Sequence, residues 1–385
     1  MNFLAKRNFK VIILLMLLMS VKIYSADLEV PNMELITRSN FDTGIPVLTT
    51  RGKIDLLVGG GYKLGGSLTV GFDSEDLGYS NTDPATLTDV PALGTYLSNQ
   101  TYLQFQSAQI IIRDLFSSPT DLTYFIGKTD VLCSGDDFPN IFGSTPIATR
   151  YHGYLYFPKN EFHGIHTING TGLKVSSNFG NDRNITSAYI YEDGYMGSGY
   201  FSSDLRTLFN FDKVKIESFL GATFPASSYG LYRAGFLFNY NSGTTGEFFA
   251  QIGVPQWDPS ENFNMDRLLF LFEPRIKFNP LTIILTLFLH PGYYLQNTTS
   301  DSGSSDVHIN FMIGEPGMST FAGGIEGSAT YNSSTPSSDQ FSVKVSPYLS
   351  AITSGVIWNI MLNTKLLPYS LNDMFEGVIS IKAEF

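Results

Sequence analysis

Apolar and polar residues alternate with a period of two along most of this chain, and this pattern constrains its fold more than any other feature. In one such run the apolar positions are Val214, Ile216 and Leu220. The polar positions between them are Lys215 and Glu217. Successive side chains of a strand point to opposite faces of a sheet, so each run predicts a strand with one apolar and one polar face.

The length of these runs separates two classes of all-β protein. Strands of soluble sandwiches average about 5–6 residues. A strand that crosses a membrane needs about 9–11 residues, with its apolar face toward lipid and its polar face toward a lumen. Many runs here have the greater length, and lipid does not tolerate open sheet edges. The sequence therefore predicts an all-β fold, a single transmembrane antiparallel β-barrel.

The N-terminal residues predict export rather than a part of the fold. Three basic residues within the first ten precede an apolar run from Val11 to Val21, and small residues follow at Ser25 and Ala26. This is the layout of a secretory signal peptide. The apolar run is too short for a membrane-spanning helix, which takes about 20 residues. We expect residues 1–25 to be a cleaved signal peptide.

Regular alternation begins at Arg51. We therefore expect residues 26–50 to form a short periplasmic N-terminal segment and residues 51–385 to form the barrel. Residues 54–72 keep one parity across two glycine clusters, which predicts one long strand there. Counting 151–157 as a further strand would raise the total toward eighteen.

Short and longer polar connections alternate between the runs. Seven short ones and eight longer ones imply about 16 strands, within a range of 14–18, and an even number places both termini on the periplasmic side. The short connections are 117–120, 178–183, 211–213, 241–246, 279–280, 315–319 and 350–354, and the longer ones are 73–98, 133–162, 194–202, 225–229, 256–266, 297–305, 333–338 and 366–372.

Charge and cysteine content exclude other classes. Residues 1–25 hold four of the 24 basic residues and no acidic one, so the mature chain carries 20 Lys and Arg against 35 Asp and Glu, a net charge of −15. Phosphate contacts need a basic surface, so we expect no nucleic-acid partner. The single cysteine, Cys133, excludes an intrachain disulfide framework.

Enzymatic chemistry finds no support in the motifs. His163 and His166 are three residues apart in a predicted strand start, so they point to opposite faces and do not chelate a metal together. His152, His290 and His308 are isolated and are interpreted as structural. Neither a Gly-x-Ser-x-Gly elbow nor a His-Glu-x-x-His motif occurs. We expect neither an enzyme nor a bound cofactor or metal.

The long connection 133–162 is the candidate pore constriction. Asp130, Asp136, Asp137 and Arg150 lie in it or beside it. If the connection folds into the lumen, these charges create a field across the pore; otherwise it is an ordinary solvated loop.

Basic residues also occupy polar faces of the strands. Facing lipid near the midplane, each would cost about 2–4 kcal/mol, so we expect them to face the lumen. They are Arg206, Lys215, Arg233, Arg267, Arg275, Lys277 and Lys344.

The final strand carries a family resemblance. Phe375, Ile379, Ile381 and Ala383 alternate with polar residues, and the sequence ends on Phe385. This resembles the C-terminal signature of bacterial outer-membrane proteins. The resemblance implies that the chain resides in the bacterial outer membrane and that Phe385 is the assembly signal read by the barrel-assembly machinery.

A second resemblance is to porins. Residues 107–142 are similar to the porin pattern of a strand, a tight turn and a second strand that leads into a Gly/Asp/Phe-rich loop. The residues that carry it are Asp114, Pro119, Gly127, Lys128, Asp130, Gly135 and Phe138. The overall character of the chain also resembles spirochaete outer-membrane proteins.

Together these features predict a porin for passive diffusion of small solutes, embedded in outer-membrane lipid. Residues 26–50 are too few for the plug of an energy-coupled importer. Two alternatives stay open: an adhesin that uses the acidic connection 73–98, and an importer of hydrophobic compounds of the fatty-acid type. A homo-oligomer is also open, and the acidic balance favours cations.

Overall fold

We describe the fold from a computed structural model. It describes residues 27–42, 45–59, 63–74, 101–144, 147, 149–151, 164–179, 184–224, 230–292, 303–332, 340–371 and 374–384. The expected signal peptide 1–25 and the expected assembly signal Phe385 lie outside these residues.

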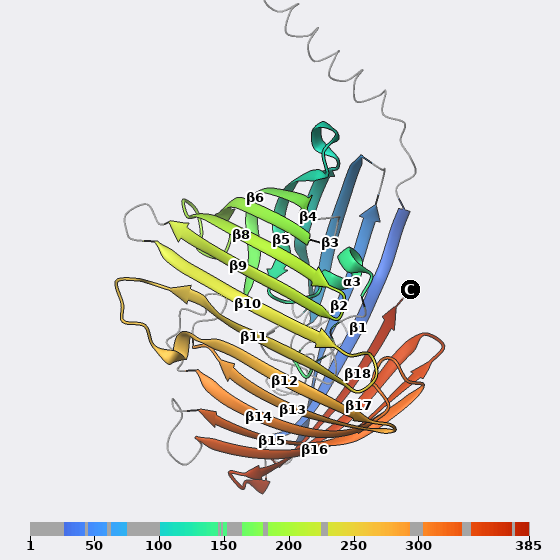
Figure 1. The fold of residues 1–385 in the computed structure, drawn as a ribbon. Helices are drawn as coiled ribbons and strands as arrows, with labels where there is room; N and C mark the ends of the chain where they lie inside the picture. Colours follow the sequence, from blue (N-terminus) through green and yellow to red (C-terminus); the bar gives the residue numbers. More distant parts are fainter. Residues whose placement is uncertain are drawn as a thin grey trace, which may run out of the picture.

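Within these residues, eighteen strands form one sheet (Figure 1). They are β1 (Asp27–Asp42), β2 (Ile45–Gly59), β3 (Leu64–Ser74), β4 (Thr101–Ile112), β5 (Thr120–Leu132), β6 (His166–Phe179), β7 (Asn184–Asp193), β8 (Phe201–Phe211), β9 (Val214–Phe224), β10 (Leu231–Asn241), β11 (Gly246–Trp257), β12 (Leu269–Phe278), β13 (Leu281–His290), β14 (Ser304–Ile313), β15 (Phe321–Asn332), β16 (Phe341–Thr353), β17 (Val356–Leu367) and β18 (Phe375–Glu384). Short helices within the described connections are η3 (Leu115–Ser117), α3 (Phe138–Phe142) and η4 (Met265–Arg267).

Neighbours in sequence are neighbours in the sheet. β1 pairs antiparallel with β2, β2 lies beside β3, and the antiparallel pairing continues strand by strand to β18. The last strand then pairs antiparallel with the first, from Asn32 opposite Glu384 to Asn40 opposite Glu376. In Figure 1 the blue first strand runs next to the red last strand. The chain is an antiparallel β-barrel, as the alternation predicted, and its first and last strands leave no edge between them.

Two additional strands at the N-terminal end explain why the count is eighteen rather than about 16. All fifteen predicted connections fall at junctions between consecutive strands from β3 to β18. However, residues 27–42 form β1 and residues 45–50 begin β2, so the region expected to be a periplasmic segment is part of the barrel. The long strand expected over 54–72 is also divided, because β2 ends at Gly59 and β3 begins at Leu64.

The strands whose side chains are described present an apolar face outward and a mainly polar face inward. On β9, Leu220 and Phe224 are 61% and 51% exposed, whereas Lys215 and Glu217 are 9% and 0% exposed. The same alternation repeats on the other walls, for example on β14, where Ile309 is exposed and Asn310 is buried. Apolar side chains toward lipid and polar side chains toward a lumen are the polarity of a transmembrane barrel.

No helix among the described residues has the length and the apolar character needed to cross a bilayer.

Candidate functional site

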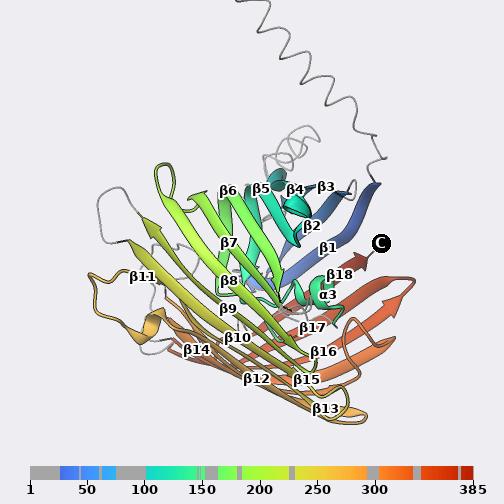
Figure 2. The same ribbon diagram turned by 45° about the horizontal axis from the view of Figure 1, so that its top comes forward.

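The chain that follows β5 folds into the barrel. It turns at Cys133, where φ is 53°, forms α3 and reaches the inner wall again at Tyr151. We call its described residues, 133–144, 147 and 149–151, the inward loop. Figure 2 shows α3 within the ring of strands. Cys133, Phe138 and Tyr151 are at most 1% exposed, and they pack in one apolar cluster with inward side chains from β5 to β13.

Local sequence sets the length of α3. Pro139 lies in its first turn, where the missing N–H of proline costs nothing. Gly143 ends it with φ of 63°, a left-handed conformation that glycine adopts without strain, and its N–H bonds the carbonyl of Pro139. The single turn places Phe138 in the apolar cluster.

A first anchor holds the start of the inward loop. The backbone N–H of Cys133 donates to Glu217 Oε1 on β9 at 2.5 Å, and Gln251 Nε2 on β11 donates to the carbonyl of Cys133 at 2.5 Å. Burial and the neighbouring Glu217 carboxylate raise the pKa of the Cys133 thiol well above its ordinary value, so the thiol stays protonated. Cys133 is therefore a structural residue of the anchor rather than a reactive one.

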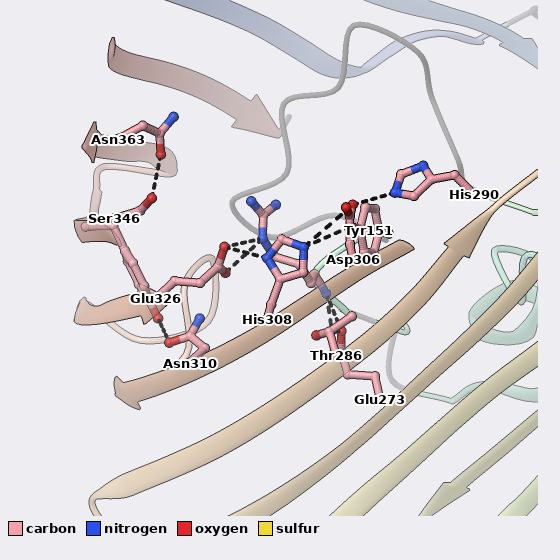
Figure 3. A network of polar contacts seen from close by, with 12 residues as sticks. Tyr151, Glu273, Thr286, His290, Asp306, His308, Asn310, Glu326, Ser346 and Asn363 are labelled. Atoms are coloured by element: carbon pink, nitrogen blue, oxygen red, sulfur yellow. Dashed lines mark hydrogen bonds and ion pairs between the residues drawn. The ribbon is translucent and has the colours of Figure 1, made fainter. Parts of the chain in front are cut away.

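A second anchor holds the end of the inward loop. The backbone N–H of Arg150 lies 3.0 and 3.2 Å from the two carboxylate oxygens of Glu273 on β12. Its Nε lies 2.9 Å from Glu326 Oε1 on β15. The Tyr151 hydroxyl donates to Asp306 Oδ2 on β14 at 2.7 Å (Figure 3). The two anchors tie the loop to five different strands of one wall.

The four residues predicted for the constriction all occupy the lumen or its inner wall, but they do not form one cluster. Asp130 belongs to β5, where its Oδ2 lies 2.7 Å from Lys174 Nζ. Asp137 contacts Arg206 Nη1 on β8 at 2.6 Å, and Asp136 beside it is exposed. Arg150 belongs to the second anchor.

Known structures share this architecture, although sequence comparison finds no relative: no protein-family model matches the chain and no curated protein is similar to it. Pseudomonas aeruginosa OccD3 (OpdP) is 9% identical, with 94% of this chain and 93% of that chain covered and a TM-score of 0.51. OpdK of the same organism, solved with vanillate, is 11% identical over 93% and 98% at a TM-score of 0.47. Salmonella typhi OmpF, solved with daunomycin, is 7% identical over 94% and 98% at 0.46.

The chain has the fold of an outer-membrane porin barrel. The likeness to OccD3 carries this conclusion, and at 9% identity it concerns the fold alone. The expected porin-like architecture is thereby confirmed.

Inside this porin barrel, carboxylates neutralise most of the predicted basic residues. Five of the seven make ion pairs, and a sixth, Lys215, donates to the carbonyl of Asp212 at 3.2 Å. Lys344 lies on β16 opposite Ser328. The ion pairs are Arg206 with Glu217 and Asp137, Arg233 with Asp204, Arg267 with Glu261, Arg275 with Glu247, Glu273 and Glu315, and Lys277 with Glu247 and Glu315.

A cavity of about 360 Å³ lies between α3 and the inner wall of β5 to β8. Its lining includes Lys174 and Arg206 from the wall, Asp137 and Ile141 from the inward loop, and Asp121 at the start of β5. Charges of both signs therefore face the same space next to the loop. Among the described residues, no group of His, Cys, Asp and Glu has the arrangement of a metal site.

Sequence reasoning missed the residues that receive the loop. Glu217, Gln251, Glu273, Asp306 and Glu326 were not singled out, although each lies at an inward position of its strand. Their inward parity was readable from the alternation. Their meeting with the loop was not, because it depends on how far the loop reaches across the barrel.

Proposed function

We propose that this protein is a pore of the bacterial outer membrane through which small water-soluble solutes diffuse passively. The observation that carries the proposal is the inward loop, held at two anchors inside a barrel whose outer face is apolar and whose inner face bears ion pairs. Barrels of 16–18 strands enclose an aqueous channel, which a loop of this kind narrows. The chain acts as a channel, not as an enzyme.

The inner surface favours hydrated solutes over hydrophobic ones. Arg275 and Lys277 share the carboxylates of Glu247 and Glu315, and Arg206 contacts two carboxylates. A hydrophobic solute would meet these charges without replacing their hydration, so the fatty-acid type of importer is less well supported. The adhesin alternative depends on 73–98, nearly all of which lies outside the described residues.

The pore should prefer cations over anions weakly. The two carboxylates on Arg206, with Asp136 exposed beside them, leave this part of the lumen with more negative than positive charge. Asp130, Asp136, Asp137 and Arg150 are the constriction residues of this proposal. A negative lumen raises the local concentration of cations.

Export and assembly complete the proposal. A signal peptide at 1–25 directs export, and the barrel-assembly machinery reads the final strand through Phe385. β18 pairs with both β17 and β1, so a correctly placed last strand joins the two ends of the sheet. A spirochaete source and a homo-oligomeric assembly are further parts of the proposal that rest on the sequence alone.

Planar-bilayer recording tests the pore. Purified protein, shown to be folded by its heat-modifiable gel mobility, should give stepwise increases in conductance when it inserts. The same preparation after heat unfolding is the control and should give no steps. A folded barrel that inserts into the bilayer without conducting would overturn the proposal.

A further inference from the structure

The second anchor of the inward loop is built around a buried histidine. His308, on β14, is 7% exposed and lies between two acidic partners. Its Nδ1 is 3.0 Å from Glu326 Oε1, and its Nε2 is 3.0 Å from the Tyr151 hydroxyl. That hydroxyl in turn lies 2.7 Å from Asp306 Oδ2 (Figure 3). A chain of contacts therefore runs from Glu326 through the imidazole and the loop tyrosine to Asp306.

This chain requires a proton on both nitrogens of His308. Tyr151 has one hydroxyl proton, which it gives to Asp306 Oδ2. Its oxygen can then accept only from a protonated Nε2, while Glu326 accepts from a protonated Nδ1. A neutral imidazole has one N–H. One of its two contacts, either Nε2 with the Tyr151 oxygen or Nδ1 with Glu326 Oε1, would then have no hydrogen between its two atoms. The full set of contacts is made by the imidazolium.

The charges around His308 support the same protonation state. Asp306 and Glu326 flank it on β14 and β15, and Glu273 approaches from β12 through the backbone N–H of Arg150. The guanidinium groups are those of Arg150, which contacts Glu326, and Arg275, which lies 3.6 Å from Glu273. The imidazole of His290, from β13, places its Nε2 2.5 Å from Asp306 Oδ2. Three carboxylates thus face two guanidinium groups, and a protonated His308 supplies a third positive charge, which favours the buried site because unpaired buried charge is costly.

The first anchor contains no such group. It consists of backbone contacts from Cys133 to Glu217 and Gln251, with apolar packing around Phe138. The two ends of the inward loop are consequently held by different physical means. The contacts at one end involve no histidine, whereas those at the other end include a protonated imidazole on the Tyr151 hydroxyl.

We propose that His308 is the proton-binding residue of a latch, by which we mean the contacts that hold the Arg150–Tyr151 end of the inward loop against β12, β14 and β15. These contacts loosen when the His308 imidazolium loses its proton. The latch is closed at acidic pH and opens as the pH rises, because a histidine stabilised by carboxylate partners contributes its stabilisation only while it is protonated. A loosened end moves about the intact first anchor and changes the width of the lumen. The expectation that this change alters the current through the barrel rests on the proposed pore function.

The test records single channels between about pH 5 and pH 9, the range in which histidine titrates. Spontaneous current transitions in the natural protein should become more frequent as the pH rises. His308→Gln, which keeps hydrogen-bonding groups but cannot carry the charge, should abolish the pH dependence. Tyr151→Phe should show frequent transitions at every pH.

His166→Gln is the matched control. His166 is also a buried inward histidine that contacts a tyrosine hydroxyl, that of Tyr191 at 3.2 Å, but both belong to the wall. It should keep the pH dependence of the natural protein. An unchanged pH dependence in both His308→Gln and Tyr151→Phe would overturn the latch, as would its loss in His166→Gln.

A second readout works even if the barrel does not conduct. Thr149 is 3% exposed beside the latch, so Thr149→Cys in a Cys133→Ser background reports opening through its reaction with a water-soluble thiol reagent. At pH 6, adding Tyr151→Phe should accelerate labelling by about ten- to a hundredfold, the expected effect of losing a hydrogen bond to a charged group. Adding His166→Gln should leave the rate unchanged. Equal rates with and without Tyr151→Phe would overturn the latch independently of the pore proposal.

Discussion

The carboxylate of Glu217 accepts a hydrogen bond from the backbone N–H of Cys133 at 2.5 Å, and 84 residues of chain separate the two. The same oxygen lies 2.7 Å from Arg206 Nε, and Arg206 also contacts Asp137 of the inward loop. One buried carboxylate therefore fixes both the entry of the loop into the lumen and the position of a wall arginine.

Replacing this carboxylate should free the start of the inward loop. Glu217→Gln keeps the shape but removes the charge that binds Arg206 and raises the pKa of the Cys133 thiol. Both effects favour reaction of Cys133, since the segment loosens and more thiolate is present at a given pH. We expect labelling at pH 8 to rise about tenfold or more, because relief of one pKa unit alone gives a factor of ten.

Glu247→Gln is the control for this change. Glu247 pairs with Lys277 and Arg275 on the wall and has no described contact with the inward loop. Its labelling rate should match that of the natural protein. Equal rates for Glu217→Gln and Glu247→Gln would show that Glu217 does not hold the loop.

Strand polarity predicts opposite behaviour at adjacent positions. In a Cys133→Ser background, cysteines at Lys215 and Lys344 should react with a charged, water-soluble thiol reagent, and cysteines at Ile216 and Val343 should resist it. The first pair faces the lumen and the second faces lipid, which excludes a charged reagent. In protein embedded in vesicles, we expect the cysteine at Lys215 to react about ten times faster or more than the cysteine at Ile216. The same ratio should hold for Lys344 against Val343. The reverse ratio would mean that the strands are turned by one residue.

Ion selectivity should depend on the acidic residues of the inward loop. The Asp137 side chain is 36% exposed and contacts Arg206, and neutralising Asp136 and Asp137 to Asn leaves that arginine with Glu217 alone. Reversal potentials under a salt gradient should move toward anions, most clearly near 0.01 M salt, where the Debye length is about 30 Å.

Asp258→Asn controls for a general loss of negative charge. Asp258 lies in the connection between β11 and β12, where hydrogen bonds from Ser260 lower the pKa of its carboxyl, so it is ionised at neutral pH. Its neutralisation should leave the reversal potential almost unchanged. A shift as large as that of the loop variant would assign selectivity to overall charge.

Assembly should depend on the final aromatic residue. Deleting Phe385 should lower the yield of heat-modifiable barrel while the signal peptide is still removed, because the sequence assigns recognition by the assembly machinery to this residue. Tyr369→Ala, a change of an exposed aromatic in the connection before β18, is the control and should assemble normally. Normal barrel yield without Phe385 would remove the strongest argument drawn from the end of the sequence.

Alternation predicted β4 to β18 well because lipid and lumen impose opposite demands on neighbouring residues. The alternation failed to predict the strands where their pairing is irregular or where a turn leaves the alternation unbroken. The pairing of β1 with β2 shifts register between Glu29 and Asn32, which interrupts the alternation near Pro31. Across 54–72 the apolar residues other than Leu57 keep even numbers on both sides of Gly59, so the pattern does not mark the turn.

The site was only partly predictable for a related reason. The sequence singled out Asp137 and Arg150 because they are charges in an unusually long connection. It could not supply their partners, since Arg150 and Glu326 are 176 residues apart and meet only through the closed shape of the wall. His308 was interpreted as an isolated structural histidine, whereas its neighbours Asp306 and Glu326 come from its own strand and the next.

The pairing of β1 with β18 has a consequence for biogenesis. It joins the first and the last strand of the described chain to leave the ribosome, with Asn32 opposite Glu384. Until β18 has been synthesised and exported, the first strand has hydrogen-bonding groups on one side that β18 has not yet satisfied. An exposed strand edge of this kind promotes aggregation. Safe passage across the periplasm thus requires that β1 be shielded for as long as its partner is missing, and a chain truncated anywhere before β18 would keep that hazard permanently.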